Sequence, residues 1–332
     1  MKIIIVGFGV VGRALAKLLQ TRIGDLKWNY GMNLRVVAIS DSKSVARATS
    51  GLKLSEALSL KEKKNMVGEQ RAEDTTALIE RSDADVLVEL TPTNPKTGEP
   101  ALRYMSAALR SGKHVVTANK GPLVVAYPEL RRLAEKKGVQ LKYSAAVGGG
   151  NPVLAFGDIC ASSEPISRVE AILNRTSNYI LTQMEEKGIP FRSALEEARR
   201  DGLAEPDPSL DVDGIDQACK IVIIANHVLR RDSFISEVNP IESIRGVTIQ
   251  RIEEARKRGK KIRMVGTIDG RLAVRLTEVD ERDPFAIRGT ADVTRFVCAF
   301  SGAKMVTSSV GGPAYTASGL LRDLVEVHNS TK

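Results

Sequence analysis

The stretch that decides the fold is residues 2–12, Lys-Ile-Ile-Ile-Val-Gly-Phe-Gly-Val-Val-Gly. Its β-branched residues predict a buried strand, and Gly7, Gly9 and Gly12 follow in G-x-G-x-x-G spacing just before a helical pattern at residues 13–19. Glycines at these positions permit a tight turn, a close approach to a pyrophosphate and close helix–sheet packing, and a helix N-terminus attracts phosphate. The stretch therefore predicts a dinucleotide site, and the alternative is a purely structural glycine turn.

The composition of the chain limits its class. At 332 residues it is long enough for two domains. The formal net charge is +9, but aromatic residues make up only 4% and basic residues are interleaved with acidic ones, which argues against a nucleic-acid partner. No apolar run could span a membrane, and the first strand leaves no room for a signal peptide. Three scattered cysteines match neither a disulfide framework nor a metal site, so we expect a cytoplasmic protein.

Strand and helix patterns alternate through residue 147. Apolar runs predict strands at residues 34–40, 85–90, 113–118 and 139–144, and helical periodicity fills the gaps at residues 54–63, 75–81, 100–111 and 127–137. This alternation predicts an α/β fold, a Rossmann-type doubly wound parallel sheet with right-handed crossovers.

The run Gly-Gly-Gly-Asn-Pro at residues 148–152 predicts a domain boundary. Beyond it, the patterns predict helices at residues 153–163, 190–200 and 215–229 and strands at residues 166–174, 262–268, 272–279 and 296–301. We expect residues 148–304 to form an α+β domain for substrate binding and dimerisation. A last helix at residues 316–327 should return to the nucleotide domain, which would then comprise residues 1–147 and 305–332.

Polar residues leave two neighbouring strands of the predicted sheet. Ligands of open parallel sheets bind beyond the carboxyl ends of the strands. Thr91, Pro92 and Thr93 follow the strand at residues 85–90, and their hydroxyls and rigid proline suit a loop that contacts a cofactor. Lys120 follows the next strand, before a Gly-Pro turn. A lysine in such a place is usually solvated, but beside a dinucleotide site we interpret its ammonium as functional.

Acidic residues are densest from Glu205 to Lys220. Crowded carboxylates are costly unless a cation or a ligand ammonium neutralises them. Asp216 and Lys220 are four residues apart and share one face of a helix. The alternative is an exposed first helical turn whose acids complement the helix dipole, but Glu205 and Asp211 lie too far upstream for that. The run therefore predicts a substrate site, whereas the spacing of a calcium loop is missing.

The chain resembles homoserine dehydrogenases in five motifs that occur in the same order. These are the G-x-G-x-x-G start, Thr-Pro-Thr at residues 91–93, Thr-Ala-Asn-Lys-Gly-Pro at 117–122, Leu-Asn-Arg-Thr-Ser-Asn-Tyr-Ile-Leu at 173–181 and the acidic run, and the glycine turn at 311–317 is also similar. The resemblance covers nearly the whole chain and leaves nothing for a fused aspartate kinase or an ACT domain. It implies a short, catalytic-only homodimer that reversibly oxidises L-homoserine to L-aspartate 4-semialdehyde with NAD or NADP, in threonine, methionine and isoleucine biosynthesis.

The same resemblance implies roles for single residues. Lys120 and Lys220 match the lysines proposed to handle the hydroxyl proton, and we expect both to approach one substrate oxygen beside the nicotinamide. Matched substrate-binding residues are Glu205 and Asp211, with Asp216 nearby, Lys220, and Thr176 at the other wall. Matched cofactor contacts are Gly9, Val10, Val11, Thr91, Lys120 and Gly312.

The chain departs from the family pattern at three positions. Arg175 stands where glycine is common and could crowd the substrate or contact its carboxylate. Leu203 stands where a tyrosine is frequent in the family, shortly before Glu205. Ser144 stands where many members have a glutamate that helps to hold a sodium ion, which leaves only the backbone carbonyls of Val147, Gly149 and Asn151 as ligands. Binding of Na⁺ is therefore left open.

The choice between NAD and NADP is open too. Asp41 follows the second predicted strand and could bond a ribose 2′-hydroxyl and repel a 2′-phosphate. Nearby polar and basic residues could instead surround that phosphate, namely Ser40, Ser42, Lys43 and Arg47. A long first connection at residues 21–33 leaves the register uncertain, so we expect use of both cofactors.

Two other functions compete with this interpretation. One is another nicotinamide oxidoreductase acting on a small amino acid or its aldehyde. The other is a non-catalytic NAD(P)-binding sensor, which Arg175 in the substrate wall would favour. Reduction of NAD(P)⁺ with L-homoserine, compared with L-malate and L-lactate, separates the three.

Overall fold

The computed structural model describes residues 1–71 and 74–331. The chain forms two compact units, one from Met1–Gly150 with Gly312–Lys332 and the other from Asn151–Gly311. None of the helices in the described ranges is both long and apolar enough to cross a membrane.

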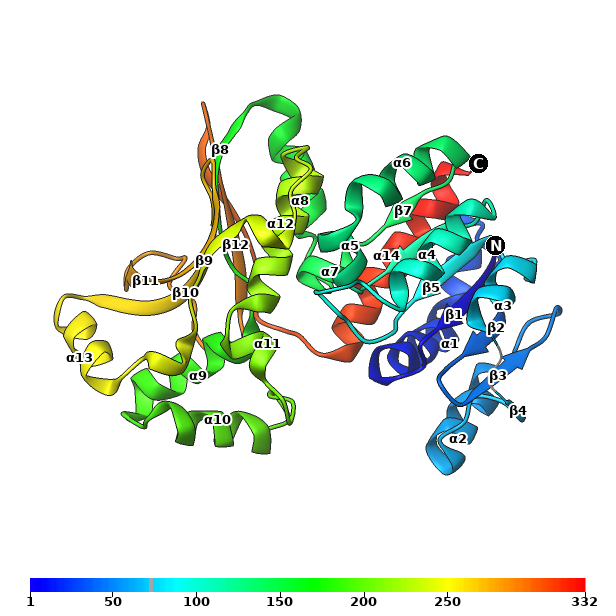
Figure 1. Ribbon diagram of the computed structural model, residues 1–332, viewed down its shortest axis with the longest axis horizontal. Coiled ribbons are helices and arrows are strands. Elements are labelled where there is room, and N and C mark those ends of the chain that lie inside the picture. The colour runs from blue at the N-terminus through cyan, green and yellow to red at the C-terminus, as the bar shows by residue number, and fades with distance from the viewer. Residues whose placement is uncertain (72–73, 332) are drawn as a thin grey trace. The chain divides into compact units, whose positions relative to one another are not determined.

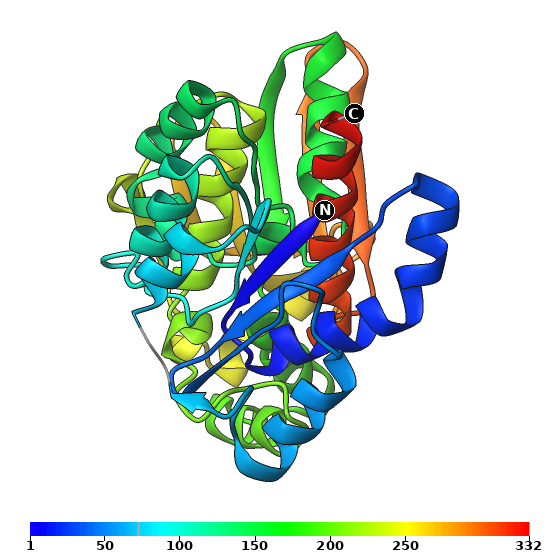
Figure 2. The same ribbon diagram turned by 90° about the vertical axis from the view of Figure 1, so that its right-hand side faces the viewer.

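The first unit is built on a sheet of seven strands in the order β4-β3-β2-β1-β5-β6-β7. The strands are β1 (Lys2–Val6), β2 (Arg35–Ser40), β3 (Ser44–Arg47), β4 (Gln70–Arg71), β5 (Val86–Glu89), β6 (His114–Thr117) and β7 (Leu141–Lys142). From β2 to β7 all neighbours are parallel, and Figure 2 shows β1 and β2 running side by side in the same direction. The predicted Rossmann-type sheet is confirmed. It is extended by antiparallel β3 and β4, which were not predicted.

Helices cover both faces of this sheet. They are α1 (Val10–Tyr30), α2 (Leu54–Lys64), α3 (Thr75–Arg81), α4 (Ala101–Arg110), α5 (Gly121–Val125), α6 (Tyr127–Lys137), α7 (Ala145–Gly148) and α14 (Pro313–Ser330). In Figure 1, α1 and α14 are neighbours on one face, where Leu15 and Leu320 pack with Ile3 and Ile5 in one core cluster. Ile4 is equally buried, because α4 packs on β5 and β6 from the opposite face. Burial on both faces explains the unbroken apolar run of β1.

The first helix corrects one expectation. Residues 21–33 are not a long connection, because α1 continues to Tyr30 and ends at Gly31 in the left-handed conformation. The short turn that follows leads directly into β2. Asp41 therefore does follow the second strand of the sheet, as the sequence predicted.

The second unit has a six-stranded sheet in the order β13-β12-β8-β10-β11-β9. The strands are β8 (Ile166–Ile172), β9 (Val238–Ile241), β10 (Lys260–Ile268), β11 (Leu272–Asp280), β12 (Asp292–Cys298) and β13 (Gly302–Ser308). The helices are α8 (Val153–Ser163), α9 (Arg175–Lys187), α10 (Phe191–Arg200), α11 (Ser209–Val212), α12 (Ile215–Val228) and α13 (Ile249–Lys257), with short 3-10 turns η1 (Ile235–Glu237) and η2 (Ile244–Gly246). Figure 1 shows α8 and α12 against one face of this sheet.

Several elements of the second unit differ from the prediction. The strand expected at residues 296–301 runs instead from Asp292 to Cys298 as β12. A turn at residues 299–301 then leads into β13, whose first residue, Gly302, has φ 76°. The strand β9 and the helices α9 and α13 were not predicted. The central strand β10 is buried on both faces: Gly266 lies against Ile221 of α12, and Arg263 on the opposite face pairs with Glu185 of α9.

The glycines of α1 offer a matched test of the helix–sheet contact. A Cβ at Gly12 would lie 2.5 Å from the backbone oxygen of Gly7, whereas a Cβ at Gly24 would have no atom within 4 Å. We expect Gly12→Ala to lower the free energy of unfolding by about 1–3 kcal/mol, as overpacking does. Gly24→Ala should raise it by about 0.5–1 kcal/mol, because alanine is the better helix former. Chemical denaturation measures both, and equal effects of the two changes would contradict the close approach.

Candidate active site

The turn from β1 into α1 leaves open space beside the backbone at Gly9. Gly7 has φ +95°, and a Cβ there would lie 2.4 Å from the carbonyl oxygen of Leu90. Gly9 caps α1 without any side chain, and nothing lies within 4 Å of the Cβ position. The N–H groups of a first helical turn have no partner within the helix and can bind an anion. Val10 is 59% exposed at this turn. The residues present therefore fit a dinucleotide pyrophosphate.

The ends of β5 and β6 lie at the same edge of the sheet as this turn. Val6, Glu89 and Thr117 are in register across β1, β5 and β6. At this carboxyl edge, β5 is followed by the loop of Thr91, Pro92 and Thr93. The next strand, β6, is followed by the half-buried Lys120, which lies directly before α5. Gly312 begins α14 in the same unit with φ +101°, a conformation that favours glycine.

Asp41 follows β2, but its carboxylate is already engaged. Oδ1 accepts hydrogen bonds from the backbone N–H groups of Lys43 and Ser44, and Oδ2 pairs with Nζ of Lys61 at 2.7 Å. Burial raises the pKa of Asp41, but the bonds from Lys61, Lys43 and Ser44 outweigh it and hold the pKa below its ordinary value. The residue is thus an ionised, partly neutralised group at the adenosine end of the predicted nucleotide site.

The second unit gathers part of the predicted substrate site around Asn174. This residue caps α9, and its Nδ2 donates to Oδ1 of Asp211 at 2.6 Å and to Oδ2 of Asp216 at 2.9 Å. Lys220 donates to Oδ2 of Asp216 at 2.5 Å and to the carbonyl of Leu173 at 2.7 Å. The predicted pairing of Asp216 with Lys220 on one helix face is present in the structure.

The electrostatics of this cluster favour a positively charged partner. Burial raises the pKa of Asp211 and the neighbouring charge of Asp216 raises it further, whereas Asn174, Lys220 and Thr176 lower it. Two close carboxylates destabilise each other's ionised form, and a cation relieves this. The ammonium of Lys220 supplies one positive charge at the cluster.

The other acids of the predicted cluster are separated from it. Asp213 forms a two-pronged ion pair with Arg245, at 2.6 and 3.0 Å, and accepts from Ser243. Asp207 accepts from the backbone N–H of Ser209 at the start of α11, and Glu205 is exposed on the loop. The crowding inferred from the sequence is therefore real only for Asp211 and Asp216.

Thr176 and Arg175 occupy the first turn of α9. The Thr176 hydroxyl donates to the carbonyl of Leu203 at 3.0 Å. Arg175 donates from Nε to the carbonyl of Thr290 at 2.9 Å, and its guanidinium covers Gly311 so closely that a Cβ there would lie 1.6 Å from Nη1. The side chain of Arg175 is therefore held against the backbone of Thr290 and Gly311 in its own unit.

Two buried acids were not identified as site residues from the sequence. Asp292 is 4% exposed, accepts a 2.7 Å bond from Nδ2 of Asn151, and has its pKa raised by burial and lowered by Asn151, Lys220 and Arg175. Glu89 is fully buried at the end of β5. A single acid at the beginning or end of a strand gives no sequence signal of its partners.

The residues near Ser144 do not favour a sodium ion. Ser144 donates from both N and Oγ to Asp323, and the guanidinium of Arg322 donates to Ser144 Oγ and to the Gly150 carbonyl. The carbonyl of Asn151, one of the expected ligands, accepts from the backbone N–H of Val153. The part of the chain that the structure describes contains no group of three His, Cys, Asp or Glu that could hold a metal. The sodium ligands expected from the sequence, the backbone carbonyls of Val147, Gly149 and Asn151, stay a prediction.

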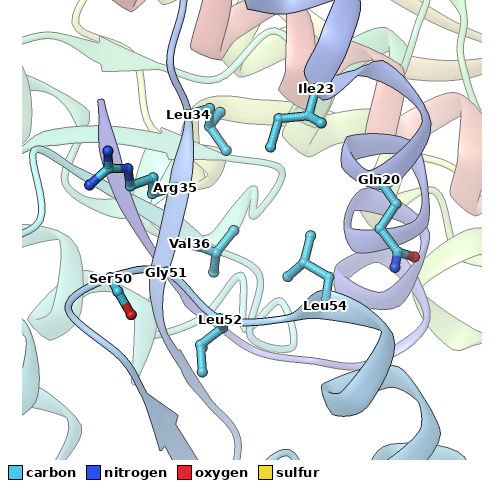
Figure 3. A pocket seen from close by; sticks show the side chains of 9 residues that line it. All are labelled: Gln20, Ile23, Leu34, Arg35, Val36, Ser50, Gly51, Leu52 and Leu54. Atoms are coloured by element: carbon cyan, nitrogen blue, oxygen red, sulfur yellow. The ribbon is translucent and has the colours of Figure 1, made fainter.

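A cavity of about 420 Å³ lies at the opposite edge of the first sheet. Figure 3 shows the apolar side chains of Ile23, Leu34, Val36 and Leu54 gathered between α1 and the start of β2. Because ligands of parallel sheets bind at the carboxyl ends of the strands, this cavity at the amino end of β2 is not the nucleotide site.

Family models match both units of the chain. Residues 7–144 match "Homoserine dehydrogenase, NAD binding domain", and residues 152–325 match "Homoserine dehydrogenase". A homoserine dehydrogenase of Methanocaldococcus jannaschii is 41% identical, with 100% of each chain covered. An NAD(+)-dependent homoserine dehydrogenase of Pseudomonas canavaninivorans is 34% identical, covering 99% of this chain and 96% of the relative.

Solved structures agree with the sequence matches. A crystal structure of an Archaeoglobus fulgidus protein assigned as a homoserine dehydrogenase superposes with a TM-score of 0.91 at 37% identity, covering 99% of both chains. A hyperthermophilic archaeal homoserine dehydrogenase mutant in complex with NADPH gives a TM-score of 0.86 at 26% identity, covering 99% of this chain and 98% of that chain.

Proposed function

The chain belongs to the homoserine dehydrogenase family, and from that premise we propose that it converts L-homoserine and NAD(P)⁺ into L-aspartate 4-semialdehyde, NAD(P)H and a proton, reversibly. The observation that carries the proposal is the Lys220 ammonium, held between Asp216 and the Leu173 carbonyl within a cluster of acids. Such an arrangement suits proton transfer to a substrate that bears its own ammonium.

Each proposed catalytic role follows from the charge of the group. When bound, NAD(P) would supply the hydride acceptor for the oxidation and the hydride donor for the reduction. Lys220 receives the hydroxyl proton during oxidation when it is a neutral amine, and it donates a proton to the aldehyde oxygen during reduction when it is an ammonium. Asp216, four residues before it on the same helix, orients its nitrogen. Lys120 is the second basic group proposed for the same proton.

The remaining substrate roles are proposed for groups of the second unit. Glu205 pairs with the α-ammonium of the substrate, a charge-assisted bond that also fixes orientation. Asp211 and Thr176 border the same site, because both contact the cluster around Asn174.

The nucleotide roles are proposed for the first unit. Gly7, Gly9, Val10, Val11 and Gly12 hold the pyrophosphate at the N-terminus of α1, where Gly9 leaves open space. The loop residues Thr91, Pro92 and Thr93, with Lys120 and Gly312, contact the nicotinamide half. We propose that the unit of Met1–Gly150 with Gly312–Lys332 binds the nucleotide and that the unit of Asn151–Gly311 binds the substrate. The bounds expected from the sequence, residues 1–147 with 305–332 and residues 148–304, place residues 305–308 in the nucleotide domain, whereas strand β13 pairs them with β12 of the second unit.

The chain is proposed to be a homodimer through its second sheet. β13 is an edge strand whose Ala303, Met305 and Thr307 are exposed. Nearby, Phe300 is 85% exposed. An exposed edge strand that carries apolar groups can pair with another chain, and a second copy of this chain is the partner proposed. A cytoplasmic location is supported by three buried free thiols, and cell fractionation tests it.

Removal of the Lys220 amine tests the proposed chemistry. We expect Lys220→Ala to lower kcat for L-homoserine by about 10²–10⁴-fold, the usual contribution of a general acid–base, with NADH affinity within about twofold of wild type. Lys187→Ala is the matched control, because Lys187 pairs with Glu197 on the surface of the same unit and should leave kcat unchanged. Steady-state assays with L-homoserine, and with L-malate as the negative substrate, measure this. Full turnover by Lys220→Ala would refute the role.

Asp41 should set the balance between the two cofactors. Asp41→Asn removes a negative charge and releases Lys61 from its ion pair, so a 2′-phosphate is less repelled. We expect the wild type to bind NADH and NADPH alike, and the variant to favour NADPH by up to about tenfold, which corresponds to about 1.4 kcal/mol. Fluorescence titration gives both dissociation constants, and an unchanged ratio would exclude Asp41 from the ribose site.

Light scattering tests the dimer. A homodimer has twice the mass of the 36.0 kDa chain, and Met305→Lys should dissociate it by placing a charge on the apolar edge. A wild-type mass of one chain at micromolar concentration would contradict the proposal.

A further inference from the structure

A buried carboxylate stands at the centre of the proposed nucleotide edge. Glu89 is the last residue of β5 and is 0% exposed, between β1 on one side and β6 on the other. None of the roles assigned above uses it. A carboxyl group buried this deeply is costly unless its oxygens are satisfied, so its partners indicate what it is for.

The two oxygens of Glu89 bind Thr91, which follows β5, and Thr117, the last residue of β6. Oε1 accepts from the backbone N–H of Thr91 at 2.8 Å and from the Thr91 hydroxyl. On the other side, the Thr117 hydroxyl lies 3.1 Å from Oε2 and 2.9 Å from the backbone oxygen of Glu89. One side chain thus ties the start of the Thr-Pro-Thr loop to the end of β6.

The network continues from Thr117 to the turn that carries Lys120. The backbone N–H of Asn119 donates to the Thr117 hydroxyl at 2.9 Å. The Asn119 side chain donates back to the carbonyl of Thr91 at 2.9 Å and accepts from the N–H of Gly121 at 3.0 Å. Lys120 lies between these two anchored residues. The two loops also touch directly, because a Cβ at Gly121 would lie 2.6 Å from the Asn94 carbonyl.

An acid suits this position better than another polar residue. The two Thr91 groups that face Glu89 are donors, and an ionised carboxylate is acceptor-only. Burial raises the pKa of Glu89 and the hydrogen bonds from Thr91, Thr117 and Asn119 partly offset this rise, so that the pKa is about 7. A carboxyl group whose burial costs this much free energy is a candidate for a functional role as well as for packing.

We propose that Glu89 is a positioning residue that locks the Thr91 loop against the Asn119–Lys120 turn and so sets the geometry of the cofactor contact and of the Lys120 amine. The inference rests on the proposed roles of Thr91 and Lys120. Glu89 reaches the cofactor and substrate only through these residues.

Three variants of the full chain separate positioning from general stability. Glu89→Leu removes the acceptors at similar volume, Glu89→Gln keeps the shape and one acceptor oxygen, and Thr117→Val removes only the hydroxyl that links the strands. We expect Glu89→Leu to raise the NADH dissociation constant by about tenfold or more and Thr117→Val by about threefold, as buried donors left unsatisfied do. The NADH dissociation constant of Glu89→Gln should lie within about threefold of the wild-type value.

A double-mutant cycle tests whether Glu89 acts through Lys120. In a Lys120→Ala background, Glu89→Leu should lower kcat with L-homoserine far less than it does in the wild type, because the amine that it positions is gone. Asp323→Leu is the matched control: Asp323 is another buried acid of the same unit, bound to Ser144, and its loss should lower the melting temperature but leave NADH affinity within about twofold.

The outcomes are distinct. Folded Glu89→Leu and Thr117→Val proteins with wild-type NADH affinity and kcat overturn the inference, as does an equal loss of affinity in Asp323→Leu. If Glu89→Leu does not fold, Thr117→Val decides by itself. A wild type that binds neither NADH nor NADPH, or a Lys120→Ala variant with full turnover, would instead contradict the proposed function.

Discussion

The close approach of backbone segments around Gly7 is the constraint on which the nucleotide half of this protein depends. A side-chain carbon at Gly7 would collide with Leu90, and one at Gly12 would collide with Gly7 itself. Only when these atoms are absent can β1, the loop after β5 and the start of α1 meet at one edge of the sheet. The N–H groups of α1 then point toward open space at Gly9, which is what a pyrophosphate requires.

Buried polar groups supply the precision that backbone packing alone does not. In the first unit, Glu89 joins the loop of Thr91 to the turn of Asn119. In the second, Asn174 bridges Asp211 and Asp216, and Lys220 is held by an acid and a carbonyl. A satisfied network in a low dielectric is stiff, because each broken bond leaves a costly unpaired group. Both clusters therefore hold their side chains in a defined geometry, which the proposed hydride and proton transfers would require.

Charge is compensated locally in both units, which changes how the acidic run is understood. Asp41 is ionised against Lys61, and Asp213 against Arg245, so neither acid needs a ligand to be stable. Asp211 differs, since burial and its neighbour Asp216 both raise its pKa. The negative charge that is not fully compensated is thus confined to a few residues around Lys220. An amino-acid substrate carrying an ammonium would relieve it.

The sequence by itself determined the features that depend on neighbours along the chain. Glycine spacing predicted the turn from β1 to α1, alternating patterns predicted the parallel sheet and most helices, and ordered motifs indicated the family. Only the tertiary structure decided the partners: Lys61 for Asp41, 20 residues away, Thr117 for Glu89, 28 away, and Asn151 for Asp292, 141 away. It likewise decided that Asp211, and not Asp213, joins the cluster of Lys220. The physical reason is that backbone conformation is set by local sterics and periodicity, whereas burial and pairing of a charge depend on which distant segments the fold brings together.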